Sequence, residues 1–162
     1  MELNSLQDLF VEDLKDLYSA ETQLTKALPK MAKAATDPDL KQAFQTHLAE
    51  TEVQIERLEK ILEELDESPK GKKCKAMEGL IEEGKELMDE DAEPEVLDAG
   101  LIGAAQKVEH YEIAGYGTVR TYAQMLGNDE AARLLQQTLD EEGMTDKKLT
   151  KLAMQCINVE AE

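Results

Sequence analysis

Apolar residues recur along most of this chain at the three- and four-residue spacing of amphipathic helices, and segments with strand-like alternation are almost absent. The pattern predicts four long helices, at about residues 5–35, 38–65, 94–126 and 129–159. A shorter amphipathic helix is expected after the basic, turn-rich connector at residues 66–75. The sequence therefore predicts an all-α fold.

The connections between the predicted helices differ in length. Two are short, which makes the helices on either side antiparallel neighbours, whereas the connection over residues 66–93 is long. One long crossover between two helical hairpins is typical of a ferritin-like four-helix bundle. An internal repeat supports this topology, because Glu21 and Glu112, like the expected N-caps Asp37 and Asn128, lie 91 positions apart. We therefore expect one ferritin-like domain over residues 1–162, with a short extra helix in the crossover.

Each long helix carries polar residues in the middle of its apolar rows, where a core residue is expected. In an antiparallel bundle these central positions lie at one height, so the side chains should meet in the core. The interruptions are Glu21 in the first helix, His47, Thr51 and Gln54 in the second, Glu109 and Glu112 in the third, and Glu142 and Asp146 in the fourth.

The apolar rows that contain the four glutamates contain no lysine or arginine. Burying an ionised carboxylate without a partner costs several kcal/mol, so protons, water in a polar cavity or metal ions must compensate the charge. Four carboxylates balance two divalent cations, and bundle cores hold di-iron or di-manganese pairs in this way. The pattern favours a dinuclear metal site, with a hydrated or protonated acidic core as the alternative.

Five segments spread over the whole chain carry a resemblance to a known family. They are YSAETQL (18–24), HLAETEVQIER (47–57), CKAMEGLIEE (74–83), KVEHYEIAGYG (107–117) and LDEE (139–142), of which the fourth is the most specific. Together they resemble the YciF/YciE-like bacterial stress proteins of the ferritin-like superfamily. The resemblance implies a rubrerythrin-like bundle that forms a homodimer, and it defines the fold more firmly than the function.

Two helices depart from the superfamily pattern. Di-iron bundles place Glu-x-x-His on each of them, whereas the corresponding positions here hold Thr51 with Gln54, and Glu142 with Thr145. Gln54 can offer a carbonyl oxygen and Asp146 a carboxylate, which gives an oxygen-rich site suited to Mn, Fe(II) or Mg rather than to zinc or copper. The predicted metal ligands are Glu21, Gln54, Glu109, Glu112, Glu142 and Asp146.

Side chains beside these ligands leave alternatives open. His47 lies seven residues before the predicted amide ligand, about 10 Å along the helix axis, which favours a hydrogen-bonding role in the core over ligation. Glu50 and Glu141 are expected at solvated edges, and would enter the site if the register were shifted by one residue. His110 points away from Glu112 and is expected at the surface or in an interface.

Aromatic, sulfur-containing and small residues complete the candidates. Tyr111 and Tyr116 bracket Glu112, where they are either plain core residues or hydrogen-bond donors and electron relays for the site. Cys74 and Cys156 are too few and too far apart for a disulfide framework, and we expect two reduced thiols, with Cys156 packed in the core. Four glycines in residues 100–117 predict close helix packing.

The charge balance narrows the expected partners. Aspartate and glutamate number 36 against 18 lysine plus arginine, a net charge of -18, and such a surface repels nucleic acid and anionic membranes. There is no apolar run of about 20 residues and no basic, apolar leader at the start. We therefore expect a cytoplasmic protein without nucleic-acid or membrane partners.

The function expected from these features is stress-related redox chemistry on a small oxidant, dioxygen or peroxide, at an Fe or Mn pair. The sequence does not identify catalytic residues or an electron donor. The alternative is a non-enzymatic helical stress protein that acts through its acidic surface and a dimer interface. A third interpretation, iron storage, requires a closed cage.

Overall fold

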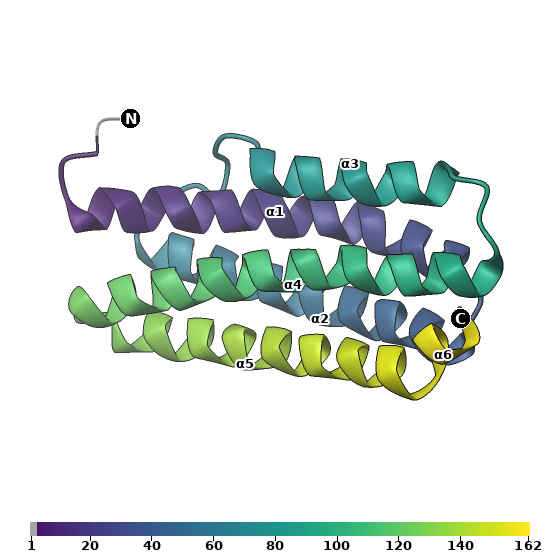
Figure 1. The fold of residues 1–162 in the computed structure, drawn as a ribbon. Helices are drawn as coiled ribbons and strands as arrows, with labels where there is room; N and C mark the ends of the chain where they lie inside the picture. Colours follow the sequence, from purple (N-terminus) through teal and green to yellow (C-terminus); the bar gives the residue numbers. More distant parts are fainter. Residues whose placement is uncertain (1–2) are drawn as a thin grey trace.

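The computed structural model describes residues 3–162, which form helices and connections without a β-strand (Figure 1). The bundle consists of α1 (Leu6–Ala34), α2 (Pro38–Glu64), α4 (Pro94–Met125) and α5 (Asp129–Leu152). The crossover holds α3 (Lys75–Asp89), and α5 continues through a π-helical turn (Ala153–Ile157) into α6 (Asn158–Glu160). The predicted all-α fold is confirmed, and the bounds of the long helices agree with the prediction to within a few residues.

Side-chain caps begin three of the long helices. Ser5 accepts a hydrogen bond from a first-turn N–H group of α1 at 3.1 Å, and Asp37 and Asn128 do the same for α2 and α5. Each cap satisfies a donor that the helix itself leaves free. Asp37 and Asn128 thus occupy equivalent turns of the α1–α2 and α4–α5 hairpins, as the internal repeat predicts.

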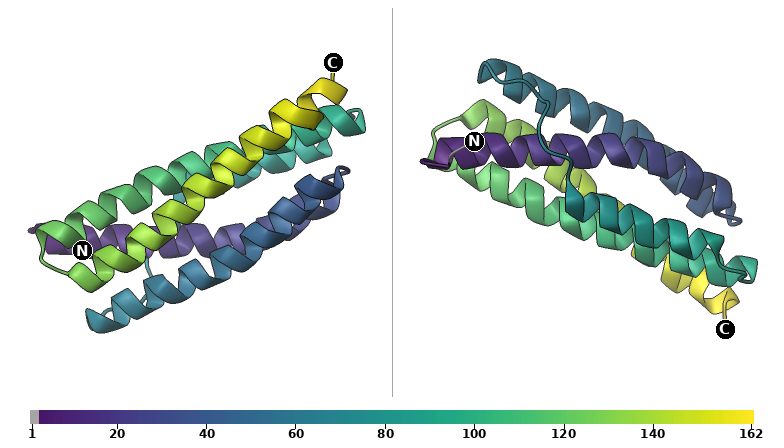
Figure 2. Two further views of the ribbon diagram at one scale, coloured as in Figure 1. Left: turned by 90° about the horizontal axis from the view of Figure 1, so that it is seen from below. Right: turned by 90° about the horizontal axis from the view of Figure 1, so that it is seen from above.

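The crossover returns the chain along the outside of the bundle, where α3 packs against α1 and α4 (Figure 2, right). Two glycines of α4 permit close approach of neighbouring helices, Gly100 toward α3 and Gly115 toward α1. A Cβ on Gly100 would lie 2.8 Å from the Leu87 side chain of α3, and one on Gly115 would lie 2.8 Å from Leu17 of α1. The predicted close packing is therefore confirmed for these two positions, while the Cα atoms of Gly103 and Gly117 face open space.

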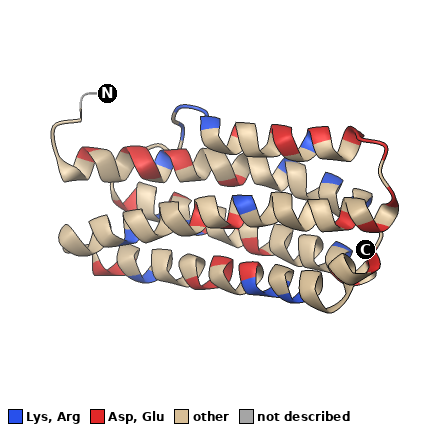
Figure 3. Ribbon diagram, in the orientation of Figure 1, with Lys and Arg blue, Asp and Glu red and all other residues tan. Residues whose placement is uncertain are grey.

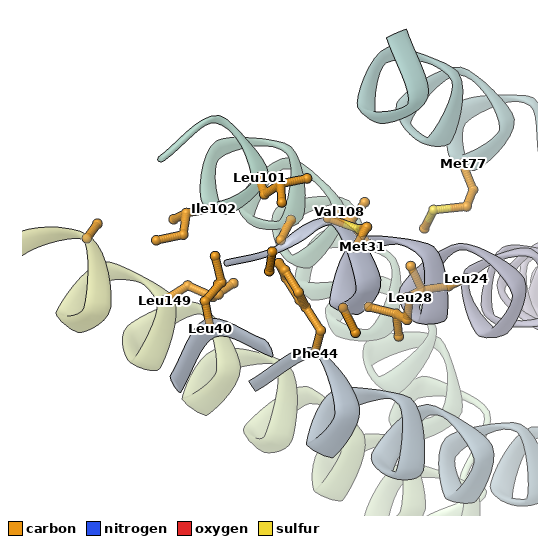
Figure 4. Close-up of a cluster of buried hydrophobic side chains, with 14 of the residues drawn as sticks. Leu24, Leu28, Met31, Leu40, Phe44, Met77, Leu101, Ile102, Val108 and Leu149 are labelled. Carbon is orange, nitrogen blue, oxygen red and sulfur yellow. The ribbon is translucent and has the colours of Figure 1, made fainter. Parts of the chain in front are cut away.

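The apolar core is divided into two clusters. One includes Leu24, Phe44 and Leu101 and lies toward the α1–α2 turn (Figure 4). The other includes Phe10 and Ile61 and lies toward the opposite end of the bundle. The buried residues Glu21, His47, Glu109, Glu112 and Glu142 lie in the layer between the two clusters, so apolar side chains shield that layer from both ends, whereas buried Asp98 lies at the α1–α2 turn.

Both cysteines are free thiols, as expected, but the expectation that Cys156 packs in the core is wrong. Cys74 is the buried thiol, 1% exposed at the start of α3, whereas Cys156 is only partly buried. The physical reason is the π-helical turn, which inserts an extra residue and rotates the following side chains around the axis. Ile157 therefore takes the core position that a regular helix would give to its neighbour.

Charged residues of both signs are distributed along the helices, with acidic ones in excess (Figure 3). Basic residues gather in the connector before α3, and acidic ones in the segment between α3 and α4. None of the helices in residues 3–162 combines the length and the apolar character needed to cross a bilayer.

Candidate metal centre

The middle layer of the bundle brings together five ionisable side chains, which we call the central cluster: Glu21 of α1, His47 of α2, Glu109 and Glu112 of α4, and Glu142 of α5. All five are at most 3% exposed. One ligand atom from each of the last four lies within 4.8 Å of the others. Glu21 joins them because its carboxyl group contacts that of Glu112. Each core helix therefore contributes to one site.

The carboxyl groups of the cluster are poorly satisfied. Both oxygens of Glu112 and of Glu142, and one oxygen each of Glu21 and Glu109, receive no hydrogen bond from any group in residues 3–162. No lysine or arginine within that range forms an ion pair with them. Unpaired buried carboxylates are costly, so the arrangement requires a compensating cation or proton.

Desolvation decides the protonation of the metal-free cluster. Burial raises the pKa of Glu112 and of Glu142 well above the usual range, and the neighbouring carboxyl groups raise both further. Burial also raises the pKa of Glu21, although its contacts with Glu112 and Tyr116 oppose that rise. Without metal, protons therefore neutralise part of the cluster, and metal binding must release them.

Tyr116 fixes the position of one carboxyl group. Its phenol, fully buried on α4, donates a hydrogen bond to Oε1 of Glu21. Burial and the adjacent acidic groups raise the pKa of Tyr116 well above its usual value, so the phenol keeps the proton that it donates. This contact agrees with the expectation that a tyrosine donates a hydrogen bond to a predicted ligand. An electron-relay role for the tyrosine stays a prediction.

His47 lies in the cluster, closer to it than the sequence analysis indicated. Its Nε2 atom is 3.0 Å from Oε1 of Glu109, and its Nδ1 atom is 3.9 Å from Oε2 of Glu50. Burial lowers the pKa of His47, but the facing carboxyl groups raise it by more, so that the net pKa is well above the usual value. The Thr51 hydroxyl, one turn later, donates to the His47 carbonyl oxygen at 2.8 Å.

Gln54 is buried on α2, but its amide is held to one side. The amide nitrogen donates to Glu141 at 3.1 Å, and Glu141 also forms an ion pair with Arg57 at 2.7 Å. The carbonyl oxygen of Gln54 has no hydrogen-bond partner among the described residues, so it remains a candidate ligand atom. Glu141 lies at the edge and is neutralised by arginine, as expected for a position outside the site.

Asp146 is not brought into the central cluster. Its carboxyl group accepts a hydrogen bond from Gln106 at 3.1 Å and lies 3.2 Å from Nε2 of His110, at the outer seam of α4 and α5. Four residues after Glu142, the side chain has rotated toward α4, where these two polar groups hold it. His110 is exposed, as predicted.

The donor set of the cluster fits a pair of divalent metal ions. Four carboxyl groups match the charge of two such ions, and carboxylate oxygens with one imidazole nitrogen suit Fe(II) and Mn(II). The imidazole was the residue that sequence reasoning underrated. Its position on the same apolar row as Gln54 was the available signal.

Comparisons with known proteins agree with this fold. The family model described as "Domain of unknown function (DUF892)" matches residues 5–162. Protein YciF of Escherichia coli (strain K12) is 52% identical over 163 residues, which cover 100% of this chain and 98% of that protein. The crystal structure of the E. coli stress protein YciF superposes with a TM-score of 0.93, over 96% of this chain and 99% of the other.

Two further solved structures extend the comparison. YcfI from Rhodopseudomonas palustris, whose description proposes a structural role, is 46% identical and has a TM-score of 0.89, over 92% of this chain and 95% of the other. A protein from Xanthomonas campestris is 21% identical with a TM-score of 0.74, over 91% of this chain and 90% of the other, and shares the fold.

Proposed function

The chain belongs to the DUF892 family, and on this premise we propose that its central cluster holds a pair of Fe or Mn ions for reaction with a small oxidant. Mg is a non-redox competitor for the same oxygen ligands. The oxidant is hydrogen peroxide or dioxygen, and the setting is a stress response, as the description of the homologue YciF suggests. When bound, such a pair supplies redox chemistry, because both metals alternate between the divalent and trivalent states.

One observation carries the proposal: buried carboxyl groups from three helices and an imidazole from the fourth converge without a basic side chain to neutralise them. A bundle built only for stability would gain from apolar residues at these positions, because replacing buried charged groups by well-packed apolar ones is often stabilising. The presence of the cluster therefore points to a ligand that offsets its cost.

The chain's own residues prepare this site in three ways. Glu109 and Glu112, three positions apart on α4, present two carboxyl groups to one space. The Tyr116 hydroxyl holds Glu21 in place and keeps its own proton at Oη. The apolar clusters shield the layer from bulk water at the two ends of the bundle, which strengthens electrostatic interactions inside it.

Stopped-flow absorbance on the protein loaded with Fe(II) tests the redox function. We expect the loaded protein to oxidise its iron with hydrogen peroxide or dioxygen faster than free Fe(II) in buffer. A Glu21→Ala and Glu112→Ala double variant should lose that advantage. A matched control, Glu52→Ala with Glu56→Ala, removes two exposed carboxylates of α2 and should react like the parent.

A structural role is the second candidate, and a specific observation favours it. YcfI, 46% identical, carries a description that proposes such a role, and a protonated acidic core would account for the cluster without metal. The same stopped-flow experiment separates the two. Equal rates for the parent and the Glu21→Ala, Glu112→Ala double variant with both oxidants would contradict the redox function and favour the structural role.

We also propose that the chain acts as a homodimer. Exposed apolar side chains on the bundle surface, among them Val96 and Met125 of α4, are candidates for such an interface. Sedimentation velocity tests this: a species of twice the chain mass supports the dimer, a monomer contradicts it, and a large closed assembly would instead indicate iron storage.

A further inference from the structure

A cavity is lined by residues of α2, α4 and α5. Its volume is about 170 Å³, enough for several water molecules. The buried part of its lining includes His47 and Glu109 of the central cluster. The exposed part includes Thr46, Met144 and Lys148. The cavity therefore extends from solvent to the ligand atoms, and we call it the entry cavity.

Two other cavities of the molecule do not reach the cluster. The one between α1, α3 and α4 is lined largely by apolar side chains such as Leu24 and Ile81. The one between α1 and α4 is lined by residues that include Tyr111 and Thr118. Neither has a member of the central cluster in its lining. The apolar core clusters shield the same layer from the two ends of the bundle.

Two polar groups stand between the solvent and the cluster in the entry cavity. The Glu50 carboxyl group is partly exposed, and its Oε2 atom lies 3.5 Å from the hydroxyl of Thr145 and 3.9 Å from Nδ1 of His47. This Nδ1 atom has no hydrogen-bond partner among residues 3–162, and the imidazole that carries it is more than nine-tenths buried. No lysine or arginine in this range forms an ion pair with Glu50. The Glu50 carboxyl group, which accepts one hydrogen bond from Thr145, thus lies beside the buried imidazole in the cavity lining.

From this geometry we propose that the entry cavity is the route by which divalent cations and the small oxidant reach the central cluster, with Glu50 as a transit ligand. The inference rests on the proposed function. A divalent cation that leaves water needs replacement oxygen ligands along its path, because its desolvation is costly. Glu50 supplies a carboxylate at the mouth, and the Thr46 and Thr145 hydroxyls lie on the same lining.

Hydrogen peroxide and dioxygen are little larger than water and fit a cavity of about 170 Å³ that holds several water molecules. The route therefore admits both small oxidants of the proposed function.

Obstruction of the mouth tests the route through the rate of metal uptake. Thr46→Trp places an indole at the exposed lining, and Thr118→Trp is the matched control, an exposed threonine on α4 that lines the cavity without cluster residues. The probe is Co²⁺ under anaerobic conditions, with uptake followed by stopped-flow absorbance and final metal content by elemental analysis. We expect uptake to slow at least about tenfold in Thr46→Trp, with the parent rate in Thr118→Trp and the same final content in both.

Met144→Trp is a second obstructing variant, to be used in case Thr46→Trp does not fold. Met144 is 61% exposed and lines the same cavity from α5. Parent uptake rates in folded Thr46→Trp and Met144→Trp would overturn the entry cavity while leaving metal binding, and hence the proposed function, in place. A parent protein that takes up no Co²⁺, Mn²⁺ or Fe(II) would overturn both.

Glu50 has its own test. Glu50→Gln should slow Co²⁺ uptake by about tenfold with an unchanged final metal content, because the transit ligand affects the path and not the bound state. Glu52→Gln, two residues along α2 and exposed, serves as the control with the same loss of charge. Equal uptake rates in the two variants would overturn the role of Glu50, since general surface charge would then explain any effect.

Discussion

The two helical hairpins, α1–α2 and α4–α5, occupy equivalent places in the bundle but contribute unequally to its centre. Glu21 and Glu112 are repeat equivalents, and both lie in the central cluster. The second hairpin adds Glu142, where the first hairpin has Thr51. The first hairpin instead supplies His47, one turn earlier on α2. The symmetry of the backbone is therefore not a symmetry of the site.

This difference concentrates negative charge on one side. Three of the four cluster carboxyl groups, Glu109, Glu112 and Glu142, come from α4 and α5, while α1 and α2 provide Glu21 and an imidazole. Two metal positions built from these halves are not equivalent, because one is richer in carboxylates than the other. We expect two ions to bind in separate steps, with the carboxylate-rich position filled first.

Restoring the symmetry should have the largest effect on the metal-free protein. Thr51→Glu gives the first hairpin the carboxyl group that Glu142 gives the second, and adds a buried charge to an acidic layer. At pH 7 we expect a loss of about 3 kcal/mol in the free energy of unfolding, largely recovered with Mn²⁺. Urea denaturation with and without metal measures this.

Thr51→Gln is the control for size, since it has the same shape as glutamate without its charge. If Thr51→Gln and Thr51→Glu are equally destabilised without metal, steric crowding and not charge accounts for the loss, and the electrostatic description of the layer is wrong.

Removing the carboxylate that has no equivalent in the first hairpin, Glu142, should have the next largest effect. Glu142→Ala deletes a ligand of the second hairpin, and we expect the affinity for the first Mn²⁺ to fall at least about 100-fold, as for loss of a ligand or its support. Thr51→Ala, the equivalent change in the first hairpin, should leave that affinity unchanged. Calorimetric titration of both variants decides whether the halves differ, and equal losses would contradict the asymmetry.

A third prediction concerns Glu112, whose charged form is opposed by burial and by the neighbouring carboxyl groups. Glu112→Gln keeps the shape and removes the buried repulsion, so the metal-free protein should be as stable as the parent or more stable, by about 1 kcal/mol. Stabilisation by Mn²⁺ should shrink in the same variant. Thermal unfolding with and without Mn²⁺ measures both, and a marked loss of metal-free stability would reveal a structural hydrogen bond to this carboxyl group.

The smallest effect is a dependence on pH. Because burial raises the folded-state pKa of Glu112 and Glu142, their contribution to stability is present below the ordinary carboxyl pKa and is lost as the pH rises through the folded-state value. The metal-free parent should therefore lose stability as the pH rises from the weakly acidic range to neutrality and above. His47, whose folded-state pKa is also raised, acts in the same direction.

In Glu112→Gln this loss of stability with rising pH should be smaller than in the parent, because the amide that replaces the carboxyl group does not titrate. Urea denaturation at several pH values without metal provides the comparison. Identical pH dependences for the parent and the variant would mean that Glu112 is not the group that titrates.

Local sequence rules were sufficient for the fold. Helical periodicity located the four long helices, and Asp37 and Asn128 capped the helices that they were predicted to cap, because capping depends only on neighbouring residues. Cys156 was misplaced because a π-helical turn depends on how the end of α5 packs, which periodicity does not report.

The sequence predicted which glutamates meet in the site, but not how far α2 is offset along its axis. Glu21, Glu109, Glu112 and Glu142 meet as their positions in the apolar rows predict. The offset of α2 along its axis is set by tertiary packing, and this offset brings Nε2 of His47 to 3.0 Å from Glu109, which the spacing along α2 did not indicate. Likewise, Asp146 is withdrawn by contacts with Gln106 and His110 that belong to another helix.

The most direct test of the central claim is the metal stoichiometry of the cluster. Protein purified without chelator, then titrated anaerobically with Mn²⁺ or Fe(II) and measured by elemental analysis, should bind about two ions per chain. The triple variant Glu21→Gln, Glu112→Gln, Glu142→Gln should bind none at the same concentrations. Two ions retained by that variant would place the metal elsewhere, and a parent that binds none would show that protons alone neutralise this acidic core.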